Sequence, residues 1–193
     1  RRSSSARSAR VSASKHRAVS LPRCRSQCAS SFPGSVPALT ASPPIVIGVD
    51  AGVSNDCFAI VAVYRERDRI FVPYARVWVP PKGGKILFSN QLDFNDLSTP
   101  EGELRRLIRL CNPLSVTFDN YQLHDMMTRL SMEFATPFHE FSQGADRLEA
   151  DKALYDRIQQ RNITHNGDPD LREHIQNANR KADGDKLRII KRA

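Results

Sequence analysis

An unbroken run of apolar residues is the first strong pattern in the chain. Residues 45–50 read Ile-Val-Ile-Gly-Val-Asp, directly after two prolines at 43 and 44. A run that is apolar at odd and even positions alike is typical of a strand buried on both faces, in the middle of a sheet. A carboxylate at the rim of such a core needs a cation or several hydrogen-bond donors. Asp50 is therefore a candidate site residue, with capping of the turn at 51–52 as the alternative.

Two further apolar runs follow closely. They cover residues 57–64 and 70–79, and the charged stretch 65–69 separates them. Three such runs joined by short links predict an antiparallel meander of three strands. Pro73 lies inside the third run, and proline cannot donate a hydrogen bond to a neighbouring strand. We therefore expect the third strand at an edge of the sheet.

From residue 99 onward the pattern alternates between helix and strand. Thr99, Pro100 and Glu101 are typical of a helix start, with a capping residue, then proline, then an acidic residue in the first turn. Apolar residues recur at helical spacing after this start, at Leu104, Leu107, Ile108 and Cys111, and again at Leu123, Met126, Met127, Leu130 and Phe134. Further helices are predicted over 144–160 and 169–179, and short strands over 114–119, 138–141 and 187–190.

This order of elements predicts an α/β fold with a mixed sheet and helices on both faces. The fourth strand returns parallel beside the first, which gives the strand order 3-2-1-4-5. That strand also ends on an aspartate, Asp119, so Asp50 and Asp119 would stand at the carboxyl ends of neighbouring strands. Two carboxylates about 5 Å apart repel by roughly 3 kcal/mol at an effective dielectric constant near 20. A proton on one of them, or a hard divalent cation such as Mg²⁺ or Mn²⁺ between them, would relieve this repulsion.

The first 43 residues differ in composition from the rest. They hold eight Lys and Arg and no acidic residue, and they lack a periodic apolar pattern. We expect a disordered basic tail over 1–43 and one domain over 44–193. An organelle-targeting peptide and a non-native leader are alternative interpretations of the tail. Cys24 and Cys28 lie there without a second pair, so they do not predict a zinc site.

The formal net charge of +8 belongs to the tail, because the remaining 150 residues hold 21 basic and 21 acidic side chains. Nucleic-acid contacts by the folded part must therefore come from local patches. Arg147 and Lys152 on the predicted helix 144–160 are the candidates, and a solvated face paired with Glu149 and Asp151 is the alternative. No apolar run reaches the length needed to span a membrane, so no membrane partner is predicted.

Four stretches together resemble the nuclease domain of the large terminase subunit of tailed bacteriophages, which has a ribonuclease H-like fold. They are residues 47–50 with 56–60, residues 118–122, residues 141–143, and residues 163–169 with Leu171 and Asn177. The resemblance covers roughly 45–193. It implies that Asp50 and Asp119 are catalytic and hold two Mg²⁺ or Mn²⁺ ions. It also implies double-stranded DNA as substrate, an ATPase domain, a small terminase subunit and a portal as partners, and the host cytoplasm as location if the chain is phage-derived.

The chain departs from this family in two respects. The family has a third metal-binding aspartate shortly after the segment that matches 187–192, whereas this chain ends at Ala193. Asp183 and Asp185 precede that segment and are poor substitutes. Residues 83–85 (Gly-Gly-Lys) lack the spacing and the hydroxyl residue of a phosphate-binding loop, so no nucleotide-binding site is predicted. We therefore expect a nuclease domain that is truncated at its C-terminus and lacks one carboxylate of its two-ion site.

The leading functional hypothesis is a metal-dependent endonuclease that cleaves double-stranded DNA during genome packaging by two-metal phosphodiester hydrolysis. One alternative is a catalytically incomplete remnant, or a DNA- or capsid-binding module of the same fold. Another is a relative of the transposases or junction resolvases, which would prefer branched DNA.

Overall fold

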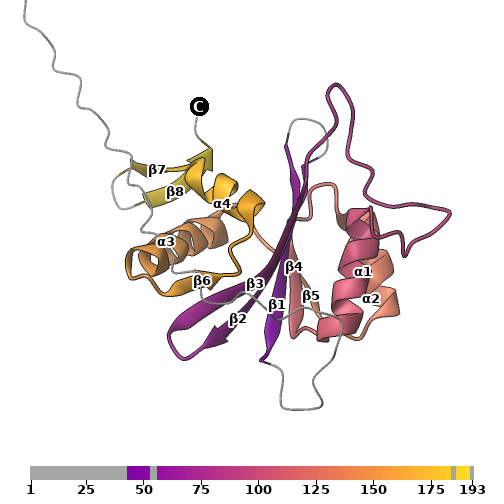
Figure 1. The fold of residues 1–193 in the computed structure, drawn as a ribbon, viewed down its shortest axis with the longest axis horizontal. Helices are drawn as coiled ribbons and strands as arrows, with labels where there is room; N and C mark the ends of the chain where they lie inside the picture. The colour runs from indigo at the N-terminus through magenta and orange to yellow at the C-terminus, as the bar shows by residue number, and fades with distance from the viewer. Residues whose placement is uncertain (1–42, 53–55, 184–185, 192–193) are drawn as a thin grey trace, which may run out of the picture.

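The computed structural model describes residues 43–52, 56–183 and 186–191, which form a mixed α/β fold (Figure 1). Its strands are β1 (Ile45–Asp50), β2 (Phe58–Glu66), β3 (Arg69–Trp78), β4 (Ser115–Phe118), β5 (Phe138–Glu140), β6 (Ile163–His165), β7 (Ala178–Asp183) and β8 (Lys186–Lys191). Its helices are α1 (Pro100–Cys111), α2 (His124–Glu133), α3 (Ala145–Gln159) and α4 (Pro169–Gln176). The predicted α/β fold class is confirmed.

The main sheet has six strands in the order β5-β4-β1-β2-β3-β6. β1 lies at its centre, antiparallel to β2 and parallel to β4, and β5 continues the parallel half. The predicted order 3-2-1-4-5 is therefore confirmed, with β6 added beyond β3. This central position explains why β1 is apolar at consecutive positions, because both of its faces are covered by protein.

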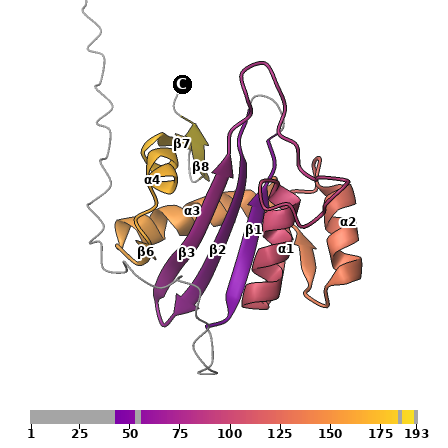
Figure 2. The same cartoon turned by 45° about the vertical axis from the view of Figure 1, so that its right-hand side comes forward.

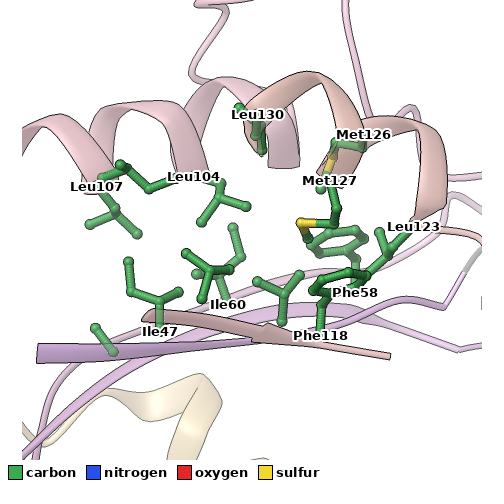
Figure 3. Packing of buried hydrophobic residues seen from close by; sticks show 14 residues of the cluster. Ile47, Phe58, Ile60, Leu104, Leu107, Phe118, Leu123, Met126, Met127 and Leu130 are labelled. Atoms are coloured by element: carbon green, nitrogen blue, oxygen red, sulfur yellow. The ribbon is translucent and has the colours of Figure 1, made fainter. Parts of the chain in front are cut away.

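Helices cover both faces of the sheet (Figure 1, Figure 2). α1 and α2 lie against one face, and α3 lies against the other. The main core fills the space between the sheet and α1 and α2, where apolar side chains of both layers interdigitate (Figure 3). Its buried members are Ile47, Val49, Phe58, Ile60, Ala62, Leu104, Leu107, Ile108, Val116, Phe118, Leu123, Met126, Met127 and Leu130. Full burial of one such large side chain contributes roughly 1.5–3 kcal/mol, so this layer is the main source of stability.

The start of α1 has the predicted cap. The Thr99 side chain accepts a hydrogen bond from the Gly102 backbone at 3.2 Å, and Pro100 begins the helix. At the other end Asn112 adopts a left-handed conformation (φ 42°), and its backbone N–H bonds the Ile108 carbonyl. Local sequence signals therefore set both ends of this helix.

A buried ionic network joins the irregular segment before α1 to α1 and α2. The Glu101 side chain is fully buried (0% exposed) and accepts hydrogen bonds from Arg129 at 2.7 Å, from Arg105 at 3.2 Å and from the Ser89 hydroxyl. Arg105 also bonds Glu133 of α2 at 2.7 Å. Because each buried charge has partners of opposite charge, the network tolerates the loss of solvent. The sequence pattern predicted only an acidic first turn here.

The prediction that β3 is an edge strand was wrong, because β6 pairs with it in parallel over Ile70–Val72. A strand of three residues is too short to leave a periodic signal, so β6 was not predicted. Pro73 follows the last residue paired with β6, and its carbonyl accepts a hydrogen bond from the Asn166 side chain at 3.2 Å. On the β2 side the pairing register shifts between Ala62 and Tyr64. The proline therefore lies where the strand pairing is interrupted on both sides.

The C-terminal segment also differs from the expectation. The predicted helix 169–179 ends at Gln176, and β7 begins two residues later. β7 pairs antiparallel with β8 in a separate two-stranded sheet, so the predicted strand 187–190 is confirmed as part of β8. Residues 1–42, with Cys24 and Cys28, lie outside the described residues. In the described part of the chain, no helix combines the length and the apolar character that crossing a membrane requires.

Candidate active site

The two aspartates predicted as site residues lie at the same edge of the sheet. β1 and β4 are parallel, and their register pairs Val49 with Phe118. Asp50 is the last residue of β1 and Asp119 directly follows β4, so both lie at the carboxyl edge of the sheet, at the ends of neighbouring strands. Gly52 follows closely and packs against Asp56, since a Cβ atom on Gly52 would lie 2.4 Å from the Asp56 carbonyl carbon. Gly52 and Asp56 are therefore in close contact just before β2 begins.

The electrostatics of Asp50 reflect this crowding. Its side chain remains partly exposed, yet the pKa of its carboxyl is raised, first because the surrounding protein partly desolvates it. The negative charges of Asp56 and Asp119 raise this pKa further. A hydrogen bond from the Ala51 backbone and the positive charge of Arg147 act in the opposite direction without cancelling the effect. The site thus favours a proton or a cation beside Asp50.

Asp119 is held at both of its carboxylate oxygens. Oδ1 accepts a hydrogen bond from the Tyr121 backbone at 3.1 Å, and Oδ2 accepts one from the Gln143 side chain at 2.8 Å. Gln143 follows β5, which is parallel to β4 and pairs Glu140 with Phe118. Three neighbouring parallel strands, β1, β4 and β5, therefore each bring one polar side chain to this edge. In the sequence, Gln143 lies in one of the stretches that resemble the terminase nucleases. A role at the site is indicated only by the structure, which places it just after β5, the parallel neighbour of β4.

Of the two predicted DNA contacts, the structure brings Arg147 to the aspartates. Its Nη1 atom donates to Gln143 Oε1 at 2.8 Å, and its charge influences Asp50. Lys152 lies exposed on the same helix, five residues further on. Five residues turn an α-helix by about 140° beyond a full turn, so Lys152 faces away from Arg147.

The carboxylates and amides of this edge fit a hard divalent cation in part. Asp50 and Asp119 would supply two carboxylate ligands, and Mg²⁺ is commonly bound by one or two carboxylates with water and phosphate completing its shell. Asn120 follows Asp119 in the chain, and its buried Oδ1 atom has no hydrogen-bond partner among the described residues. Within residues 43–52, 56–183 and 186–191, no group of three or more His, Cys, Asp or Glu side chains is placed to hold a metal ion.

Neither candidate position for a third carboxylate lies on β1, β4 or β5 in the described part of the chain. Asp183 closes β7, in the separate two-stranded sheet, and Asp185 lies outside the described residues. Asp56, which the sequence analysis did not assign to the site, is the further carboxylate that acts on Asp50. Its Oδ1 atom accepts a hydrogen bond from the Cys57 backbone at 2.8 Å.

No protein-family model matches the sequence, and no curated protein matches it. Solved structures do. The large terminase of bacteriophage HK97 superposes with a TM-score of 0.60 at 17% identity, over 78% of this chain and 36% of that chain. This chain has the fold of phage large-terminase nuclease domains. The nuclease domain of bacteriophage SPP1 large terminase, solved with bound Mn, gives a TM-score of 0.50 at 16% identity, over 76% of this chain and 77% of that chain.

A third similar structure is the large terminase nuclease from the thermophilic phage G20c, with a TM-score of 0.51 at 12% identity, over 78% of this chain and 72% of that chain. The predicted resemblance and the ribonuclease H-like fold are therefore confirmed as statements about the fold. At identities of 12–17%, the similarity shows the fold and does not assign a function to any individual residue of this chain. This chain also covers little more than a third of the HK97 protein, whose other parts have no counterpart in the matched segment.

Proposed function

We propose that residues 44–193 form a metal-dependent DNA endonuclease domain that hydrolyses phosphodiester bonds of double-stranded DNA during genome packaging. The observation that carries the proposal is the parallel pairing of β1 with β4, which sets Asp50 and Asp119 side by side at an accessible edge of the sheet. The bound Mn in the SPP1 nuclease domain supports the choice of ion. Fold similarity to three terminase nucleases supports the choice of reaction.

In this proposal Asp50 and Asp119 hold Mg²⁺ or Mn²⁺ as a two-ion site. When bound, such ions activate a water and stabilise the leaving oxygen of the phosphodiester. Asp50 must lose its proton to bind an ion, so its raised pKa makes ion binding compete with protonation. The Asp119 carboxylate is oriented before an ion binds, by hydrogen bonds from the Tyr121 backbone and the Gln143 side chain. The exposure of Asp50 leaves room for a DNA strand to approach.

Double-stranded DNA is the proposed partner, with Arg147 and Lys152 as phosphate contacts. Arg147 lies beside the aspartates, where a phosphate would be cleaved, whereas Lys152 faces away from Arg147 and would contact the DNA backbone only where the duplex wraps around α3. A terminase ATPase domain, a small terminase subunit and a portal are proposed as assembly partners by the same family likeness.

The decisive test is cleavage of linear and supercoiled DNA by the purified chain, with Mn²⁺ or Mg²⁺ and with EDTA. We expect ion-dependent cleavage and a loss of at least about 100-fold in rate for Asp50→Asn and for Asp119→Asn, since each removes a charged ligand worth several kcal/mol. Asp156→Asn, on the exposed far end of α3, is the matched control and should cleave like the wild type. A cleavage rate unchanged in Asp50→Asn would remove the assignment.

The second candidate is a non-catalytic module of the same fold that binds DNA or a capsid protein. The observation that favours it is the lack of a third acidic ligand among the described residues. Calorimetry separates the two candidates. Retained DNA binding without any heat of Mn²⁺ or Mg²⁺ binding supports the module, whereas divalent-ion binding that Asp119→Asn abolishes supports the nuclease.

A further inference from the structure

The side chain of Gln143 lies between a proposed ion ligand and a fixed cation. Its Nε2 atom donates to Asp119 Oδ2 at 2.8 Å, and its Oε1 atom accepts from Arg147 Nη1 at 2.8 Å. We propose that Gln143 is a positioning residue for Asp119, which it holds in the orientation that binds the divalent ion. This inference rests on the proposed function and adds a residue to which no role has been given.

The chemistry of the two neighbours requires an amide at this position. An ionised carboxylate only accepts hydrogen bonds, and a guanidinium only donates them. A glutamine amide satisfies both at once, with its nitrogen toward Asp119 and its oxygen toward Arg147. Because the Arg147 side chain offers no acceptor, it sets which end of the amide faces Asp119. A glutamate or a methionine in place of Gln143 would lose the bond to Asp119.

Arg147 is itself anchored on the side away from Gln143. Its Nη2 atom donates to the Ile189 carbonyl of β8 at 3.3 Å, and its Nε atom lies 3.6 Å from Asp151 Oδ2. The same Asp151 oxygen accepts a hydrogen bond from the Ile189 backbone at 3.0 Å. The helix α3 and the strand β8 therefore fix the guanidinium, and through it the Gln143 amide.

The arrangement leaves Asp119 able to bind an ion. Its two oxygens each accept one hydrogen bond, from Tyr121 and from Gln143, and each carboxylate oxygen has a second lone-pair direction. Partners that orient a metal-binding carboxylate in this way are worth roughly 10–100-fold in metal affinity when they are removed. Gln143 thus supplies orientation without occupying the coordinating positions.

The test is Mn²⁺ binding to the full chain, measured by calorimetry and by the Mn²⁺ paramagnetic resonance spectrum. In Gln143→Met, a side chain of similar length without the amide, we expect affinity to fall by roughly 10–100-fold and the spectrum of the residual bound ion to change. Thermal unfolding in EDTA should stay near that of the wild type, because the Gln143 side chain is exposed. Gln159→Met, the same substitution on the exposed last turn of α3, should bind Mn²⁺ like the wild type.

Two further variants complete the experiment. Arg147→Met should give a smaller loss than Gln143→Met, since the amide can still reach Asp119 but is no longer held in one orientation. Should Gln143→Met fail to fold, Gln143→Asn, which is shorter by one methylene group, carries the same expectation.

The outcomes separate this inference from the proposed function. If the wild type binds Mn²⁺ and Gln143→Met binds it with the same affinity and the same spectrum, the positioning role is overturned and the nuclease proposal stands. Wild-type protein that binds no Mn²⁺ at all would overturn both.

Discussion

Replacing Asp50 by asparagine should make the ion-free protein more stable, although it removes a proposed ion ligand. The pKa of the Asp50 carboxyl is raised, so its charged form is less favourable in the folded chain than in the unfolded chain. For an acid with a raised folded pKa, the folded state holds the proton more tightly, and stability falls as pH rises through that pKa. Above that pKa, Asp50→Asn removes this unfavourable charge without changing the size of the side chain.

The repulsion between Asp50 and Asp119 sets the magnitude. Neighbouring strands lie about 5 Å apart, and two unit charges at that distance repel by about 1 kcal/mol in bulk water and about 3 kcal/mol at an effective dielectric constant of 20. Asp50 is exposed, so solvent screening favours the lower figure. A gain of about 1 kcal/mol corresponds to a rise of roughly 2–4 °C in Tm for a chain of this size.

Thermal unfolding at pH 7.5 in EDTA and in Mn²⁺ tests both parts of this reasoning. In EDTA, Asp50→Asn should unfold at a higher temperature than the wild type, and Asp156→Asn should match the wild type. In Mn²⁺ at about 100 times its dissociation constant, the wild type should gain about 2.7 kcal/mol, and Asp50→Asn should gain almost none. A lower Tm for Asp50→Asn in EDTA, or an equal response of the two proteins to Mn²⁺, would refute the account of a carboxylate pair that awaits an ion.

Two further predictions concern the buried ionic network of α1 and α2, and a third concerns the segment beside Asp50. Arg129→Met removes a partner of the buried Glu101 and should lower the free energy of unfolding by roughly 2 kcal/mol in urea titrations, whereas Arg172→Met on the exposed face of α4 should not. Burial alone would raise the pKa of Glu101, but hydrogen bonds from Arg129 and Ser89 lower it below its usual value. The ionised carboxylate therefore stabilises the fold above about pH 4.3, and this contribution should be lost as acid protonates Glu101. An acid titration followed by circular dichroism would show the loss. Gly52→Ala places a Cβ atom 2.4 Å from the Asp56 carbonyl carbon, so Asp56 should be displaced. We expect the free energy of unfolding to fall by roughly 1–3 kcal/mol and Mn²⁺ binding to weaken. Gly83→Ala, where the added Cβ atom would meet no neighbour within 4 Å, should leave Mn²⁺ binding unchanged.

Local patterns predicted the elements that are long or that carry a cap. The run at 45–50 predicted a central strand because both of its faces are apolar. Thr99 and Pro100 predicted the start of α1. β6 escaped prediction because three residues gain their strand conformation from pairing with β3 and not from their own sequence. The same reason explains why the sequence predicts helix at residues 178–179, since their strand conformation depends on pairing with β8, which comes later in the chain.

The site divides in the same way. The positions of Asp50 and Asp119 followed from the predicted topology, because β4 returns parallel beside β1 and so places both carboxyl ends at one edge of the sheet. Gln143 and Arg147 become significant only through contacts between elements that are distant in the chain, such as the bond from Arg147 to Ile189. Spacing along a helix could not distinguish Arg147 from Lys152 until the position of α3 beside the sheet was known.

In the described part of the chain, no third acidic side chain is placed to share a metal ion with Asp50 and Asp119, and this affects how ion and DNA would bind. A divalent ion held by Asp50 and Asp119 alone keeps several waters, and a phosphate oxygen of DNA is a natural replacement for one of them. The ion would then strengthen DNA binding, and by thermodynamic reciprocity DNA would strengthen ion binding by the same factor. Arg147 would add to this coupling, because its charge faces the aspartates while its other contacts are to α3 and β8. A site built in this way needs its substrate to complete the coordination of the ion, so ion affinity measured without DNA understates the affinity during cleavage.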